Sequence, residues 1–375
     1  MSDEAAIRQA IGSAQRIVVK LGSSSLTDQY GGVDKDRIAH FVDVLARCHN
    51  QGRQVVLISS GAIAAGMAPL GLAHRPHDLA HQQACAAVGQ RQLIQHYGDC
   101  FSSHGIIVGQ VLLTAEDLMR RSTYTNALRT LGTMIRMGVV PIINENDTVA
   151  THEIRFGDND RLAALVAQLI GADALILLSD VDGLYSSHPD DPDSYQITCC
   201  DVEMMDKIDT HRSGSSVGTG GMTTKLHAAQ ISAHGGIPAL IGAASDIDQA
   251  VDGCKGTVFT PSKRRLPRKL LWLAHASMTR GIVRVDRGAH QALCDRNASL
   301  LAAGIIDIEG DFLAGDPVEI TDPHGERIGR GIINFSAGDL RTMMGKRSLD
   351  LIETRGEEYG REVIHRDFLV LGTDK

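Results

Sequence analysis

Six short apolar runs, separated by stretches long enough for helices, restrict the folds that this chain can adopt. They occupy residues 17–19, 55–58, 106–108, 139–143, 174–178 and 238–241. Each run is continuously apolar, as expected of strands buried on both faces, and parallel strands need long crossover connections. The pattern therefore predicts an α/β fold with a mainly parallel sheet. Ligands of such sheets bind beyond the carboxyl ends of the strands, so the residues after each run are candidate site residues.

Small-residue turns follow the first two runs, and each leads into a predicted helix. They read Gly-Ser-Ser-Ser at 22–25 and Ser-Ser-Gly-Ala at 59–62. Such turns expose backbone N–H groups and the positive end of a helix dipole to an anion, although Ser24 and Ser60 are equally consistent with ordinary helix caps. Lys20 is the more informative residue, because a lysine that closes a buried strand is costly unless its ammonium group meets an anion or reaches the sheet edge.

Polar side chains follow two later runs of the predicted sheet. Residues 144–147 read Asn-Glu-Asn-Asp, and Asp-Asn-Asp at 158–160 opens a helix. One of these side chains suffices to cap that helix, so the whole set predicts a recognition site. Ser179 and Asp180 follow residues 174–178 and precede an Asp-Gly turn, which is either an ordinary strand exit or a nucleotide contact.

A glycine-rich stretch, residues 218–225, reads Gly-Thr-Gly-Gly-Met-Thr-Thr-Lys and ends where the chain turns helical. Its glycines let backbone N–H groups approach an anion, and its threonines and lysine add donors, which suits a polyphosphate. A mobile surface loop is the alternative interpretation. The stretch is not a P-loop, which would need glycine at Thr224, nor a dinucleotide fingerprint, which would need glycine at Thr223.

Composition limits the partners and the compartment of the chain. The 375 residues include 37 Lys and Arg against 45 Asp and Glu, a net charge of −8, so no general attraction to nucleic acid or anionic membranes is expected. The seven cysteines show no C-x-x-C spacing, which predicts neither a zinc site nor a disulfide framework. Asp3 and Glu4 do not fit a signal peptide, and no apolar run reaches about 18 residues. We therefore expect a cytoplasmic protein without a membrane segment.

The character of the sequence changes from about residue 259. We predict a first domain over residues 1–258, a basic, proline-containing linker over 259–280, and a small β-rich domain over 281–375. Short strand-like runs in the last part cover residues 281–285, 316–320, 327–334 and 363–371. An RNA-binding protein is the competing hypothesis. The net charge and an aromatic content of 4% weigh against RNA binding as the main role.

Two lysines and turns rich in N–H groups suit phosphoryl transfer, which depends on alignment of the reactants and neutralisation of charge. A hydroxyl acceptor usually needs a general base, and none is evident. A carboxylate acceptor, with a pKa of about 4, is already ionised at neutral pH. The residues therefore favour an acyl phosphate product.

Six sequence blocks, in this order, resemble the amino acid kinase family: IVVKLGSSSL, VVLISSGAIAAG, PIINENDTV, FGDNDRLAALVA, LLSDVDGLY and GTGGMTTKLHAA. The resemblance covers about residues 14–258 and implies a three-layer sandwich. It further implies ATP- and Mg²⁺-dependent phosphorylation of the γ-carboxylate of L-glutamate, the first step toward proline, with feedback inhibition by proline. From about Gly281 the chain resembles a PUA domain, so a PUA-like module is expected there.

The resemblance also assigns roles to residues. Lys20 and Lys225 would hold the transferring phosphoryl group, and Asp160, or alternatively Asp158, would orient the two ammonium groups. The glutamate-binding positions would be Ser60, Asp147 and Asn159, with Asp147 facing the substrate α-ammonium group. The ATP-binding positions would be Lys20, Ser179, Asp180, Thr219, Gly220, Gly221, Met222, Thr223, Thr224 and Lys225.

The sequence departs from the family pattern in two places, and further expectations complete the prediction. Ser179 stands at a position where the family frequently has threonine. Residues 186–194 differ from the usual family sequence, so the contacts to the adenine base are not assigned. No protein metal site is expected, because Mg²⁺ is held mainly by phosphates and water. A homo-oligomer, proline as inhibitor, and contact with the reductase that consumes glutamyl phosphate complete the expectations.

Overall fold

A computed structural model of the chain describes residues 3–27, 32–119, 121–149, 158–187, 191–201, 221–262, 273, 279–296 and 298–372. Contacts within the chain divide it into two units, Met1–Leu266 and Pro267–Lys375. The predicted linker over residues 259–280 falls largely outside the described residues, so its character stays a prediction.

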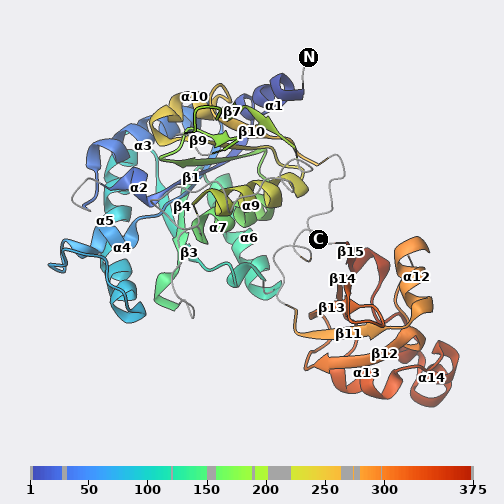
Figure 1. Cartoon of the computed structure of the whole chain (residues 1–375). Coiled ribbons are helices and arrows are strands. Elements are labelled where there is room, and N and C mark those ends of the chain that lie inside the picture. Colours follow the sequence, from blue (N-terminus) through green and yellow to red (C-terminus); the bar gives the residue numbers. More distant parts are fainter. Residues whose placement is uncertain are drawn as a thin grey trace. The chain divides into compact units, whose positions relative to one another are not determined.

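An eight-stranded sheet with the order β3-β4-β2-β1-β5-β9-β10-β8 forms the centre of the first unit (Figure 1). Its strands are β1 (Arg16–Leu21), β2 (Gln54–Ile58), β3 (Val108–Leu113), β4 (Val140–Glu145), β5 (Ala174–Ser179), β8 (Cys199–Cys200), β9 (Ala239–Ala243) and β10 (Thr257–Phe259). Each neighbouring pair from β3 to β9 is parallel, and β10 joins β9 in the antiparallel direction. The predicted mainly parallel sheet is confirmed. A separate two-stranded ribbon pairs β6 (Leu184–Tyr185) with β7 (Gln196–Ile197).

Helices cover both faces of this sheet, which gives the three layers. In Figure 1, α3 and α10 lie on one side of the sheet, and α6, α7 and α9 lie on the other. The helices are α1 (Asp3–Gly12), α2 (Ser23–Leu26), α3 (Lys35–Asn50), α4 (Ala62–Met67), α5 (Leu79–Ser103), α6 (Arg121–Arg136), α7 (Asp158–Ile170), α9 (Gly221–His234) and α10 (Ile247–Val251). Short 3-10 turns are η1 (Asp117–Met119), η2 (Asp147–Val149) and η3 (Ala244–Asp246).

Strand β1 shows why the apolar runs are continuous. Ile17 and Val19 belong to the core cluster that includes residues of α3 and α5, whereas Val18 points to the opposite face. All three side chains are fully buried. Because each face of the strand meets a helical layer, no position of the run is left for a polar side chain.

Strand β3 differs from its prediction. The apolar run at residues 106–108 suggested a strand there, but the strand covers Val108–Leu113. It is an edge strand whose residues are half-buried or exposed, and its exposed positions are Gln110 and Leu112. An edge strand is covered less completely than a central one, so its sequence lacks the continuous apolar signature.

Helices α4 and α5 cross with their backbones in close approach. A Cβ atom added to Gly66 would collide with the carbonyl oxygen of Cys85, and one added to Gly89 would collide with that of Ala62. Each helix therefore carries a glycine where the other passes. This crossing fixes the position of α4, and hence of the turn that precedes it, relative to α5.

The second unit is built on a five-stranded sheet with the order β12-β11-β13-β14-β15. The strands are β11 (Gly281–Val285), β12 (Ile305–Gly310), β13 (Pro317–Thr321), β14 (Arg327–Ile332) and β15 (Leu369–Leu371). Its other elements are α12 (Arg287–Arg296), α13 (Ala337–Met343), α14 (Ser348–Arg355), η5 (Ala302–Gly304), η6 (Glu357–Gly360) and η7 (Arg366–Phe368). The β-rich character is confirmed, whereas β12 and these helices were not predicted.

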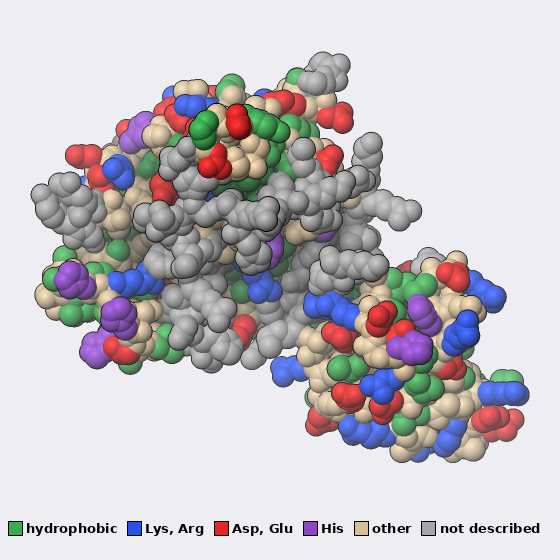
Figure 2. Space-filling view, viewed as in Figure 1, with side chains coloured by type: hydrophobic (Ala, Val, Ile, Leu, Met, Phe, Trp, Pro, Cys, Tyr) green, Lys and Arg blue, Asp and Glu red, His purple; other side chains and the backbone are tan. Residues whose placement is uncertain are grey.

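Both signs of charge are interspersed on the face of the second unit that Figure 2 shows. Arg284 pairs with Asp307 and Glu309, each at 3.1 Å, and Arg327 lies 4.0 Å from Glu319. These pairs neutralise part of the positive charge that a nucleic-acid surface would need. Along the part of the chain that the structure describes, none of the helices has the length and apolar character required to cross a bilayer.

Candidate active site

Lys20 lies near the carboxyl end of the central strand β1. It is opposite Ile58 of β2 and Leu177 of β5, and only 4% of it is exposed. Burial lowers the pKa of Lys20, an effect that the nearby Asp160 opposes and that the charge of Lys225 reinforces. An ammonium group in this place needs an anion, as the sequence predicted.

The first turn of α7 supplies that anion. Asp160 is fully buried, and its Oδ1 lies 2.6 Å from Lys20 Nζ. Its Oδ2 lies 3.4 Å from Lys225 Nζ and accepts a hydrogen bond of 2.8 Å from the hydroxyl group of Thr224. One carboxylate therefore bridges two ammonium groups. We call Lys20, Asp160 and Lys225 the charged cluster.

Asp160 is held in its ionised form. Burial raises the pKa of Asp160, but the charges of Lys20 and Lys225 outweigh it, together with hydrogen bonds from Lys20 and Thr224, so that the pKa lies below its ordinary value. A carboxylate engaged at both oxygens by cations is a poor proton acceptor. Its chemical capacity is to fix the positions of the two ammonium groups.

The glycine-rich stretch contributes the start of α9. Gly221, Met222, Thr223, Thr224 and Lys225 form the first turns of this helix, and Lys225 also donates to the carbonyl oxygen of Gly221 at 3.1 Å. Lys225 is 7% exposed. The cluster therefore lies beside the beginnings of two helices, α7 and α9, whose dipoles favour negative charge. Thr219 and Gly220 lie outside the described residues.

A network of uncharged side chains adjoins the charged cluster. Asn159 Nδ2 donates to the hydroxyl oxygen of Ser60 and to Asn144 Oδ1, both at 3.1 Å. Asn144 Oδ1 also accepts from the backbone N–H of Glu145 at 2.9 Å, and Asn144 Nδ2 donates to Gln90 Oε1 at 2.7 Å. We call Ser60, Gln90, Asn144 and Asn159 the amide network.

The amide network leaves two polar groups for a ligand. Asn159 Oδ1 is buried and has no hydrogen-bond partner among the residues that the structure describes. The hydroxyl oxygen of Ser60 accepts from Asn159, so the hydroxyl proton remains able to donate. Ser60 is held by a turn in which Gly61 has a φ of 88°, a conformation that favours glycine. The arrangement offers an acceptor to a cationic group and a donor to a carboxylate.

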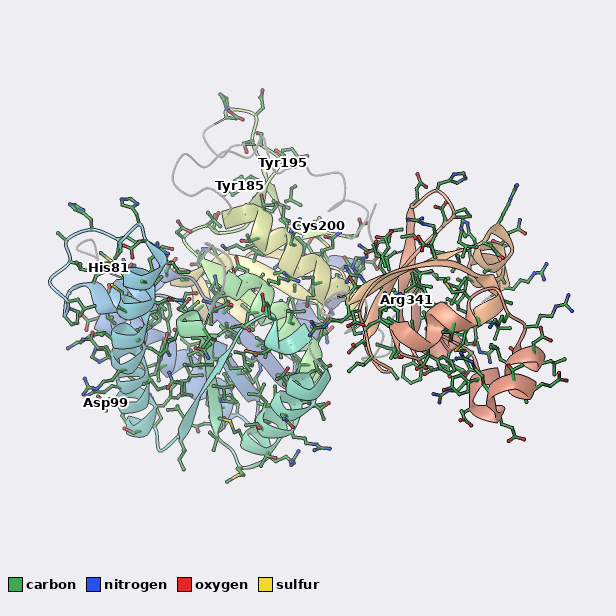
Figure 3. The ribbon with its side chains drawn as sticks, turned by 90° about the horizontal axis from the view of Figure 1, so that it is seen from below. His81, Asp99, Tyr185, Tyr195, Cys200 and Arg341 are labelled. Atoms are coloured by element: carbon green, nitrogen blue, oxygen red, sulfur yellow. The ribbon has the colours of Figure 1, made fainter. Side chains whose placement is uncertain are left out.

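The other predicted site residues lie at neighbouring strand ends. Asp147 is buried in η2 after β4, and Arg75 lies within electrostatic range of it. Ser179 ends β5 and is buried, and Asp180 follows it and acts electrostatically on Lys20. Of the residues labelled in Figure 3, Tyr185 belongs to strand β6, and Tyr195 directly precedes strand β7. Asp158 is the first residue of α7, but its side chain lies outside the described set.

Sequence reasoning missed Gln90 and did not anticipate that Thr224 would contact Asp160. A signal for Gln90 exists in α5, where it stands seven residues before the fully buried Tyr97. This spacing returns to the same face of a helix. The Tyr97 hydroxyl group lies 3.1 Å from the hydroxyl group of Ser59, so two polar contacts on one face of α5 support the turn and strand end of the site.

The donor set of the charged cluster does not suit a metal ion. Both carboxylate oxygens of Asp160 contact cationic or hydroxyl groups of the protein. Within the described ranges, no group of three His, Cys, Asp or Glu side chains is arranged to hold a metal. Any divalent cation at this site would therefore have to bring most of its ligands with it.

The fold and the charged cluster can now be compared with known proteins. Residues 15–243 match the amino acid kinase family, and residues 281–354 match the PUA domain. The chain therefore belongs to the amino acid kinase family. Among solved structures, carbamate kinase from Giardia lamblia bound to AMP-PNP has a TM-score of 0.51 at 17% identity, over 67% of this chain and 100% of that chain. This likeness concerns the fold alone.

Curated relatives within the family are more specific. A "Glutamate 5-kinase" of Cutibacterium acnes is 53% identical over 97% of this chain and 93% of that protein. A "Glutamate 5-kinase" of Streptomyces coelicolor is 51% identical over 98% of this chain and 99% of that protein. Both relatives therefore match this chain across its two units.

Proposed function

We propose that the chain transfers the γ-phosphoryl group of ATP to the γ-carboxylate of L-glutamate and so forms L-glutamyl 5-phosphate, the first step of proline biosynthesis. The observation that carries the proposal is Asp160 between two buried lysines, directly beside the amide network, in which the Ser60 hydroxyl group can donate and Asn159 Oδ1 can accept. The relatives named glutamate 5-kinase support the choice of substrate.

In this reaction the protein neutralises charge and aligns the reactants. Lys20 and Lys225 would contact the transferring phosphoryl group from two sides, where they stabilise the negative charge of its oxygens. Asp160 keeps the two ammonium groups in place and screens them from each other. The acceptor carboxylate attacks as an anion, so no side chain has to remove a proton from it. Gly221 to Thr224, Ser179 and Asp180 would form the nucleotide side, and Thr219 and Gly220 remain part of this assignment.

Glutamate would bind on the side of the amide network. Its α-ammonium group would meet Asp147 and the free Oδ1 atom of Asn159, and a carboxylate group would accept from Ser60. Mg²⁺ would arrive with ATP, held mainly by phosphate oxygens and water rather than by side chains, and would help to neutralise the negative charge of the phosphates. Asp160 is the residue that we assign to the lysines, with Asp158 as the alternative.

The proposal includes four features that do not come from the geometry of the site. Feedback inhibition by proline is implied by the family resemblance, a cytoplasmic location is expected from the composition, and a homo-oligomer and contact with the reductase that consumes glutamyl phosphate are further expectations. Acyl phosphates hydrolyse and cyclise readily, which is the chemical reason for direct transfer to a reductase. The test measures the product of the reductase. We expect a higher yield when the two enzymes are mixed than when a dialysis membrane separates them.

Trapping of the acyl phosphate as a hydroxamate tests the proposal. The purified chain, ATP, Mg²⁺ and hydroxylamine are incubated with L-glutamate, L-aspartate or N-acetyl-L-glutamate, each with and without proline. We expect product from L-glutamate, and less of it when proline is present. Product from one of the other acceptors but not from L-glutamate would assign the chain to a different reaction of the family.

A further inference from the structure

Gln90 is remote in sequence from every predicted site residue, yet it contacts the amide network. It lies in the middle of α5, between the labelled His81 and Asp99 in Figure 3. Its Oε1 atom accepts the hydrogen bond of 2.7 Å from Asn144 Nδ2. We propose that Gln90 is a positioning residue, which orients the amides of Asn144 and Asn159 and thereby sets the polarity of the acceptor pocket. The inference rests on the proposed function.

The orientation of Asn144 follows from a group that can only donate. The backbone N–H of Glu145 points at Asn144, so the atom that it meets must be the carbonyl oxygen Oδ1. The Nδ2 atom of Asn144 then faces away, toward Gln90, and requires an acceptor there. Since Asn144 is 2% exposed, water does not readily replace that acceptor.

The orientation of Asn144 determines that of Asn159. Asn144 Oδ1 is an acceptor, so the atom of Asn159 that faces it must be Nδ2. The two protons of this Nδ2 are used on Asn144 and Ser60, and the Oδ1 atom of Asn159 is left buried and unpaired. Each amide thus fixes the next, from α5 to the start of α7.

The consequence is that the amide network presents a fixed arrangement of donors and acceptors. A buried acceptor oxygen of Asn159 favours a cationic group and disfavours a second carboxylate. L-glutamate carries one such cation, its α-ammonium group. Gln90 would therefore influence discrimination between L-glutamate and glutarate, which has the same two carboxylates but no ammonium group.

The close crossing of α4 and α5 supports this assignment. Gly89, adjacent to Gln90, packs against the backbone of α4, and α4 begins directly after the turn that holds Ser60. The backbone of Gln90 is consequently held at a fixed distance from the site. A flexible side chain on such a rigid segment can hold its partner in a single orientation.

The test compares three variants of the full chain in the hydroxamate assay. Gln90→Met keeps the length of the side chain without an acceptor, and Gln90→Glu restores an acceptor oxygen. Gln95→Met makes the same change on the exposed face of the same helix and serves as the matched control. For each variant, kcat and the KM values for L-glutamate and ATP are measured, as is the ratio of kcat/KM for L-glutamate to that for glutarate.

We expect Gln90→Met to raise the KM for L-glutamate about tenfold and to lower the glutamate-to-glutarate ratio by a similar factor, with the KM for ATP unchanged. Gln90→Glu should recover most of both losses, and Gln95→Met should match the wild type. Wild-type values in Gln90→Met, or equal losses on both acceptors, would overturn the inference and leave a merely structural role. A wild-type chain that forms no product from L-glutamate would instead overturn the proposed function, and this inference with it.

Discussion

The charged cluster and the amide network are neighbours that differ in kind. Both depend on the first turn of α7, where Asn159 and Asp160 are consecutive residues that reach different partners. Asp160 meets two ammonium groups, whereas Asn159 meets only neutral groups. Charge placed where negative charge develops acts on the transition state, while neutral groups of fixed polarity act on recognition. The first turn of α7 thus contributes to both the charged cluster and the amide network. Mutations should separate their effects on kcat from their effects on the KM for L-glutamate.

Loss of either lysine should have the largest effect and should appear in kcat. We expect Lys20→Ala and Lys225→Ala each to lower kcat about a hundredfold to a thousandfold, because in the proposed reaction each lysine would stabilise the negative charge of the transferring phosphoryl group. The KM for L-glutamate should change little. Lys255→Ala, which removes a lysine paired with Asp246 at an exposed site, is the control and should keep normal kinetics. A near-normal kcat in either lysine variant would refute the proposed division of roles between the charged cluster and the amide network.

Neutralisation of Asp160 should destabilise the fold in a manner that depends on pH. Asp160→Asn leaves two buried ammonium groups without their anion, which typically costs about 3 kcal/mol at neutral pH. The pKa of Lys20, already lowered by burial, falls further when the opposing carboxylate is removed. A base with a lower pKa in the folded state binds fewer protons there than in the unfolded chain, so stability rises with pH toward the ordinary lysine value.

Urea unfolding at about pH 7 and about pH 9.5 measures this effect. The difference in unfolding midpoint between wild type and Asp160→Asn should narrow at the higher pH. If the difference in unfolding midpoint is the same at both pH values, the lowered pKa of Lys20 is not the cause of the lost stability. Any loss of stability in an Asn159→Ala variant should be the same at both pH values, since this substitution removes no charge.

A substitution that moves α4 away from α5 should disturb the amide network more than the charged cluster. Gly89→Ala would press a methyl group against the carbonyl oxygen of Ala62, so we expect a loss of about 1–3 kcal/mol in stability and a higher KM for L-glutamate. Gly98→Ala is the matched control in the same helix, since its Cβ would lie 4.0 Å from Val108 and find space. That variant should be neutral or slightly more stable, because alanine favours helices. Equal behaviour of the two variants in unfolding and kinetics would contradict the role of the crossing.

Removal of the Ser60 hydroxyl group should give the smallest effect. Ser60→Ala deletes one neutral hydrogen-bond donor, which corresponds to a rise of about three- to tenfold in the KM for L-glutamate. Because the group is not aimed at the transferring phosphoryl group, kcat should stay within about twofold of the wild type. Steady-state kinetics with ATP held at saturation measure both. A fall in kcat with an unchanged KM would place Ser60 functionally with the lysines.

The charged cluster was more accessible to sequence reasoning than the amide network. Lys20 stands out because a buried strand rarely ends in a lysine, and Asp160 stands out because the helix start is richer in acids and amides than capping requires. The contact between them then follows from the shared edge of a parallel sheet. The family resemblance already placed Asp160 before Asp158 as the bridging residue, and the structure adds the contacts of both Asp160 carboxylate oxygens.

Ser60 and Asn159 were predicted as substrate-binding residues and Asn144 lies in the predicted recognition stretch, but the hydrogen bond that joins them to Gln90 was missed, because it depends on how α5 packs beside the site. Gly66 and Gly89 are poor helix formers and give no sign, in one sequence, that two backbones meet there. Gln90 is one of several glutamines in α5, and only the crossing selects it. Likewise β12 was missed, although its alternation of apolar and acidic residues is the pattern typical of a half-buried edge strand.

The three side chains of the charged cluster carry one positive charge in excess, held in the interior of a folded protein. The unfolded chain has no such site, so a polyanion that occupies it binds only the native state. Ligand binding and folding are therefore thermodynamically coupled. A nucleotide at a hundred times its Kd would raise the free energy of unfolding by about 2.7 kcal/mol. In a cell, the unfolded fraction of this protein would fall as the concentration of such a nucleotide rises.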